Sequence, residues 1–144
     1  MKHLLLLSTL GLLAIACKKE KKPTPPEQAV NKTIEYHLFA GKDYSHPIYA
    51  AVTAQIRLQV RKINYHTGDM QLVWDSTIAE RKITEFPQQA QRIILQKSFP
   101  VLESTEKLTG SFGVMYFDGG YISQFGASTE VVPGKTKELL EVPL

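Results

Sequence analysis

The chain has 144 residues, 43% of them hydrophobic, and a formal net charge of +3 at pH 7. This length suits a single domain, and this apolar fraction is too high for a disordered protein. Residues 31–144 hold 12 basic and 12 acidic side chains, so the excess positive charge lies in the first 22 residues. A nucleic-acid-binding domain concentrates basic residues on its folded surface, so we expect no nucleic-acid partner.

Residues 1–16 have the layout of a secretory signal peptide. Lys2 gives a positive start, and the stretch 4–16 that follows contains no charged residue. A helix needs roughly 20 residues to cross the hydrocarbon core of a bilayer, so this stretch is too short to span it. It has the length of the apolar core of a signal that is removed on export, with small residues, Ala14 and Ala16, before the expected cut.

The only cysteine, Cys17, lies where the apolar stretch meets a lysine cluster. The preceding sequence, LAIAC, resembles the lipobox of bacterial lipoproteins, in which the cysteine thiol is lipidated and becomes the mature N-terminus. Ala14 stands where a lipobox usually has Leu, and Ala14-Ile15-Ala16 also fits an ordinary A-x-A cleavage site, which would leave a soluble periplasmic protein. We expect lipidation, because the single cysteine is at the one position where lipoprotein chemistry needs a thiol.

The next residues, KKEKK, resemble the mature start of lipoproteins of the Bacteroidota. This resemblance implies an outer-membrane location, facing either the periplasm or the cell surface. Residues 17–30 show no apolar periodicity and contain Pro23, Pro25 and Pro26. Proline-rich chain extends by roughly 3.1 Å per residue, so we predict a basic, flexible tether that holds the folded part off the bilayer.

From about residue 31 the sequence changes to an alternation of period two, which predicts β-strands. In residues 52–60 the apolar side chains take one parity and the polar side chains take the other, whereas a helix would scatter them around its axis. Gly68-Asp69 and Asp118-Gly119-Gly120 supply turn residues between such segments. The other predicted strand segments are 34–38, 70–74, 93–101, 108–116, 121–127 and 139–142.

Seven or eight short strands predict an all-β fold over residues 31–144 as a single domain. We expect an antiparallel sandwich that resembles the immunoglobulin-like class, which has about this size; the alternative is a small β-barrel. Trp74 falls in the third predicted strand, where that class often buries a tryptophan. No cysteine follows Cys17, so burial of the core must stabilise the domain without a disulfide.

The sequence contains no local signature of a catalytic or metal centre. It has neither a G-x-S-x-G nucleophile elbow nor a phosphate-binding glycine loop. Three histidines follow the signal segment, His37, His46 and His66, and their long, irregular spacings do not match a zinc motif. We therefore predict no catalytic residue, no metal site and no cofactor.

Two short stretches are candidate sites. Tyr44, His46 and Tyr49 fall in a predicted loop, where exposed rings stack on sugars or peptides; the alternative is that both tyrosines cover the end of the core. Asp75-Ser76-Thr77 resembles the short O-glycosylation motif of exported Bacteroidota proteins. This resemblance makes Ser76 a candidate acceptor.

These observations predict an exported, lipid-anchored, non-catalytic module at the outer membrane that binds or assembles with protein or glycan. The alternative is a small periplasmic or surface hydrolase, or a ligand carrier. A deep polar pocket that joins one of the histidines to a carboxylate would favour the enzyme. A shallow exposed patch or an exposed edge strand would favour the binding module.

Overall fold

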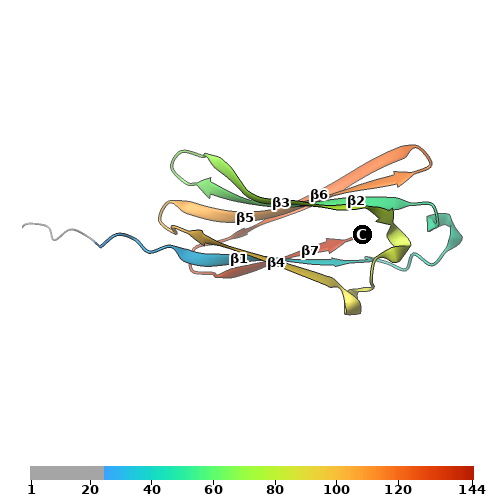
Figure 1. The fold of residues 1–144 in the computed structure, drawn as a ribbon, viewed down its shortest axis with the longest axis horizontal. Helices are drawn as coiled ribbons and strands as arrows, with labels where there is room; N and C mark the ends of the chain where they lie inside the picture. Colours follow the sequence, from blue (N-terminus) through green and yellow to red (C-terminus); the bar gives the residue numbers. More distant parts are fainter. Residues whose placement is uncertain (1–24) are drawn as a thin grey trace, which may run out of the picture.

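The computed structural model describes residues 25–144, which form seven strands in two stacked sheets (Figure 1). The predicted signal peptide, Cys17 and most of the predicted tether lie outside the described residues. Within residues 25–144, helical structure is limited to three short 3-10 turns, and no helix is long and apolar enough to cross a membrane. The strands are β1 (Val30–Phe39), β2 (Thr53–Asn64), β3 (Met70–Lys82), β4 (Ile93–Val101), β5 (Glu106–Asp118), β6 (Tyr121–Val131) and β7 (Lys137–Pro143).

The predicted all-β sandwich is confirmed, and the alternative of a small barrel is wrong because both sheets remain open. One sheet has the order β4-β1-β7 and the other has the order β3-β2-β5-β6. A constant-type immunoglobulin sandwich also has sheets of three and four strands, but its strand orders, A-B-E-D and C-F-G with the strands lettered in chain order, differ from those found here. Neighbouring strands are antiparallel with one exception. Strand β7 runs parallel to β1, with Thr33 opposite Lys137 and Phe39 opposite Pro143.

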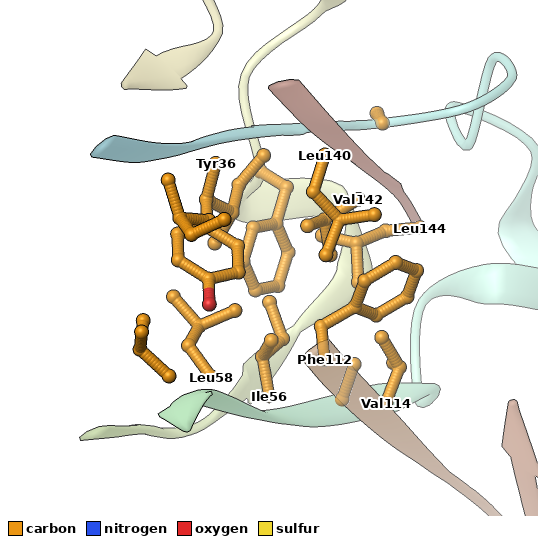
Figure 2. Close-up of a cluster of buried hydrophobic side chains, with 14 of the residues drawn as sticks. Tyr36, Ile56, Leu58, Phe112, Val114, Leu140, Val142 and Leu144 are labelled. Atoms are coloured by element: carbon orange, nitrogen blue, oxygen red, sulfur yellow. The ribbon is translucent and has the colours of Figure 1, made fainter. Parts of the chain in front are cut away.

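The core lies between the two sheets and follows from the alternation of the strands. Ile34, Tyr36 and Leu38 of β1 are fully buried, and they face Ile56 and Leu58 of β2, which are fully buried as well. Figure 2 shows Tyr36, Leu140, Val142 and Leu144 on one side of this cluster and Ile56, Leu58, Phe112 and Val114 on the other. Because no disulfide is present in residues 25–144, burial of these side chains is the main stabilising term.

One glycine of β5 fixes how closely the sheets approach. Gly110 occupies an inward position, and a Cβ there would lie 2.6 Å from Cγ2 of Ile34. A side chain at this position would push the sheets apart, so Gly110 belongs to the apolar face of its strand without contributing a side chain to it.

Two lysines point between the sheets. Lys97 lies opposite Ile34 in the β1–β4 register, on the inward face, and its Nζ is 5.0 Å from the ring centroid of Trp74. Lys32 is 1% exposed, and its Nζ lies 2.8 Å from Oε1 of Glu103 and donates to the carbonyl of Val132 at 3.0 Å. Trp74 itself is only half-buried, because it lies on the edge strand β3 rather than in the middle of a sheet.

Candidate binding face

The predicted aromatic loop lies against the end of the core. Tyr44 is buried, and its ring packs edge-on against Tyr49 with 5.1 Å between the ring centroids. Lys42 Nζ lies 4.7 Å from the Tyr49 ring centroid and donates to its hydroxyl at 3.0 Å. His46 accepts a hydrogen bond from the backbone N–H of Ile48 through Nδ1 at 3.3 Å, and so caps a short turn. Most polar and aromatic groups of this loop therefore contact other groups of the same loop.

A small cleft adjoins this loop, with a volume of about 150 Å³. It lies between the loop and the segment 83–88, and Tyr44, Ser45, Ile83 and Phe86 contribute to its wall. Sites for small molecules usually measure roughly 300–1,000 Å³, so this cleft is too small for a sugar or a peptide side chain together with its backbone.

The candidate glycosylation residue, Ser76, lies in the middle of β3. It is opposite Leu58 in the β2–β3 register and is half-buried, on the side that faces the core. The preceding Asp75 points to the outer side and accepts two hydrogen bonds from Arg57. The three residues of the motif therefore lie in a regular strand, and the acidic side chain is hydrogen-bonded to Arg57.

The histidines do not come together, but one of them contacts a carboxylate. His66 and His46 are exposed in separate turns. His37 is 7% exposed on the outer face of the three-stranded sheet, and its Nε2 lies 2.7 Å from Oε1 of Glu35. Neither the small cleft beside the aromatic loop nor the larger cleft on the outer face of the four-stranded sheet is lined by His37 or Glu35.

The neighbours of Glu35 stabilise the ionised form of its carboxylate. The Lys137 ammonium, which donates to the Glu35 carboxylate at 2.5 Å, is the main cause of a pKa below the ordinary range; burial opposes it, and His37 and Gln96 add to it. The carboxylate is therefore held ionised, whereas a general acid needs a pKa near the working pH. Within residues 25–144, no three potential metal ligands cluster.

A larger cleft lies on the outer face of the four-stranded sheet. Its volume is about 710 Å³, which falls in the range of ligand sites. Four strands contribute to it. Most of its surface comes from two rows of outward-facing residues that lie side by side across these strands. The lining residues are Gln55, Arg57, Thr77, Gly113, Val114, Met115, Gln124, Phe125 and Gly126.

The cleft is hollow because two glycines face each other at its centre. Gly113 of β5 is directly opposite Gly126 of β6, so this part of the outer face carries no side chain. A Cβ at Gly126 would lie 2.5 Å from the carbonyl oxygen of Phe112, so the close approach of β6 to β5 requires glycine there. A Cβ at Gly113 would have no atom within 4 Å.

Packing therefore gives no reason for Gly113, and its φ is not positive. Glycine inside a strand costs roughly 0.5–1 kcal/mol relative to alanine, mainly through the entropy of the unfolded chain. A glycine in such a position often marks a place where a ligand or another backbone approaches closely. Gly113 is the residue of this face that the fold alone does not explain.

Polar side chains surround the bare backbone at Gly113 and Gly126, and one of them, Arg57, is held in place by hydrogen bonds. Arg57 lies beside Gly113 in the β2–β5 register, and its Nε and Nη2 donate to the two carboxylate oxygens of Asp75 at 3.1 and 2.5 Å. These bonds lower the pKa of Asp75 and raise that of Arg57, so both groups stay charged. A paired guanidinium still has free donors, because it carries five N–H groups.

The neighbouring row adds two amides and an apolar side chain. Gln55, Met115 and Gln124 lie side by side across β2, β5 and β6. Met115 is 37% exposed, and its flexible thioether adapts to varied apolar partners. Phe125 faces inward instead, opposite Val114, and packs edge-on against Phe112 at 5.2 Å between centroids. The cleft therefore offers hydrogen-bonding groups, one apolar side chain and bare backbone.

Of the residues that line this cleft, the sequence singles out only Thr77, as part of the Asp75-Ser76-Thr77 motif and not for this site. The available signal was a glycine at an outward position between two buried residues, Phe112 and Val114. Comparisons with protein families, with curated proteins and with solved structures find no match for this chain.

Proposed function

We propose that this chain is an exported, lipid-anchored, non-catalytic module at the outer membrane that binds an extended segment of a partner protein in the cleft around Gly113. The observation that carries the proposal is the bare floor formed by Gly113 and Gly126 on a face otherwise covered by side chains. A peptide backbone can approach another backbone closely only where side chains are absent.

The groups around the floor suit a peptide. The Gln55 and Gln124 amides offer both donors and acceptors for peptide groups, and the free donors of Arg57 suit carbonyl or carboxylate oxygens. Met115 supplies an adaptable apolar contact. A glycan would usually stack on an aromatic ring, and the lining of this cleft includes one aromatic residue, Phe125, whose ring packs against Phe112.

Photocrosslinking at Gly113 tests this assignment. A benzophenone amino acid at position 113 in the full chain, expressed in its native envelope, should crosslink to a protein on irradiation. Ser98, on the exposed outer face of β4, is the matched control position and should give no such product. The Gly113→Leu variant should lose co-purification of the same protein at least tenfold, whereas Ser98→Leu should retain it.

Two results would overturn the assignment to a protein segment. A crosslinked product whose added mass is removed by glycosidases would indicate a glycan ligand. Equal crosslinking at positions 113 and 98, or full co-purification with Gly113→Leu, would remove the cleft as the binding site.

The proposed anchor depends on the sequence around Cys17 and has its own test. Labelling of cells with an alkyne-tagged palmitate should mark the chain, and Cys17→Ala should abolish the label. Labelling that persists in Cys17→Ala, or a purified chain without acyl mass, would contradict the lipid anchor.

A further inference from the structure

The outer edge of β6 is open. β6 is the last strand in the order β3-β2-β5-β6, and within residues 25–144 no strand pairs with its other side. Residues 121–128 are all exposed, including Tyr121 at 84% and Ile122 at 67%. Residues 121–129 contain neither a charged residue nor a proline. Such an edge presents alternate backbone N–H and C=O groups to any strand that approaches it.

The other three edge strands carry features that discourage pairing. β3 has two register irregularities against β2, next to charged residues. β4 contains one lysine and a proline, and β7 contains three charged residues and a proline. Natural proteins use bulges, charges and prolines to protect sheet edges, so the unprotected edge of β6 is a distinct property of this strand. The protecting residues are Asp75, Glu80, Arg81 and Lys82 in β3, Lys97 and Pro100 in β4, and Lys137, Glu138, Glu141 and Pro143 in β7.

We propose that β6 pairs antiparallel with β6 of a second copy of this chain about a two-fold axis. The two four-stranded sheets would then form one continuous sheet. An interface of this kind is self-complementary. Where residue i of one copy meets residue j of the other, residue j of the first copy also meets residue i of the second. The proposal concerns the edge of β6 and does not depend on the ligand of the cleft.

The charge pattern of β6 favours a second copy. With Phe125 on the two-fold axis, Tyr121 lies opposite Thr129 of the partner subunit and Ile122 lies opposite Ser128 of the partner subunit. No like charges would meet in this register. Like charges directly opposite each other destabilise a pair of strands, and this pairing avoids them. Glu130, the nearest acidic residue, falls beyond this stretch and is already paired with Lys107 at 2.6 Å.

The arrangement of the layers is compatible with a second copy. The two sheets form separate layers (Figure 1), so a two-fold axis perpendicular to the four-stranded sheets would place both three-stranded sheets on one side of the dimer. β1, the first strand after the tether, belongs to the three-stranded sheet. Because the axis reverses the strand direction, the segments that precede β1 would leave this layer at opposite ends of the dimer, and both clefts would lie on the opposite face. Gln124 and Gly126 line the cleft and lie on β6, so the two clefts would adjoin.

Disulfide trapping in cells that express the full chain tests this interface. Phe125→Cys places one thiol beside its own copy at the axis, so we expect a reducible species with the mass of two chains. Ala79→Cys, on the edge strand β3, should give none, and the wild type provides the baseline for Cys17. Phe125 packs against Phe112, so the double variant Ser123→Cys/Ala127→Cys, whose thiols would lie opposite each other, gives a second test.

Charges added to the strand make the test specific for the register. Ser123→Lys/Ala127→Lys places lysine opposite lysine twice, and the yield of the Phe125→Cys dimer should fall at least fivefold. Ser123→Lys/Ala127→Glu places opposite charges together, and the yield should stay within twofold. The proposal is overturned if neither cysteine variant forms the dimer, if the trapped species has the mass of a different protein, or if both charge variants behave alike. None of these outcomes bears on crosslinking at Gly113.

Discussion

Gly113 and Gly126 face each other across β5 and β6, yet the fold requires glycine at only one of the two positions. A Cβ at Gly126 would meet the carbonyl oxygen of Phe112, whereas a Cβ at Gly113 would stand in open space. The two positions therefore separate a glycine needed for the fold from a glycine that we assign to the function.

Alanine at the two positions should have opposite effects on stability. Gly113→Ala should raise the free energy of unfolding by up to about 1 kcal/mol, because it restricts the unfolded chain and meets no neighbour. Gly126→Ala should lower it by roughly 1–3 kcal/mol, because the backbone of β5 must move. Urea unfolding of both variants measures the difference, and equal effects at the two positions would contradict the packing argument.

The Glu35 carboxylate should make the stability depend on acidic pH. Its pKa lies below the ordinary value of 4.5 in the folded protein, chiefly because of Lys137. The fold therefore favours the ionised form, so this contribution is complete above about pH 5 and is lost as the pH falls through the lowered folded-state pKa. Between pH 5 and pH 3, wild type should lose more stability than Glu35→Gln.

Urea unfolding at several pH values measures this dependence. Lys137→Met should also flatten the acidic part of the curve, because it removes the main cause of the lowered pKa. Glu141→Gln, on the neighbouring strand opposite His37, is the matched control and should keep the wild-type slope. Wild type and Glu35→Gln with parallel pH curves would show that the Glu35 network does not act in this way.

The buried pair of Lys32 and Glu103 should respond unequally to removal of its two members. Glu103→Gln leaves a buried ammonium with the carbonyls of Val131 and Val132 as its remaining partners, so it should clearly destabilise the fold. Lys32→Met removes the buried charge and keeps a similar shape, and Glu103 lies close enough to solvent to be hydrated. We expect Lys32→Met to change the free energy of unfolding by no more than about 1 kcal/mol.

Thermal unfolding of both variants at neutral pH compares the two effects. The Glu103→Gln variant should melt at the lower temperature. A lower melting temperature for Lys32→Met would mean that the charge itself, rather than its pairing, stabilises this end of the sandwich.

The sequence predicts the fold well where one face of a strand meets the core. Residues 52–60 alternate because β2 lies in the middle of its sheet with one face covered. Lys97 interrupts the alternation of β4, and only the structure shows that it faces inward onto Trp74. In β6 the alternation is weak, because Tyr121 and Ile122 are both apolar and Ser123 and Gln124 are both polar, and residues 121–128 are exposed on both faces.

The sequence alone does not predict features that depend on pairing between segments far apart in the chain. The parallel pairing of β7 with β1 depends on strands whose register partners, such as Thr33 and Lys137, are far apart in the chain. The cleft depends on Gly113 and Gly126 being opposite each other, which requires the β5–β6 register. The sequence places Tyr44 and Tyr49 in one loop, but only the structure shows that their rings pack against each other.

The parallel pair of β1 and β7 has a consequence for how the protein is made. β1 is the central strand of its sheet, yet one of its two neighbours is made more than a hundred residues later. A chain that emerges from a ribosome or an export channel with its N-terminus first cannot complete this sheet until residues 137–143 are free. The complete three-stranded sheet, and the part of the core that Leu140, Val142 and Leu144 fill, can therefore form only after synthesis or translocation of β7.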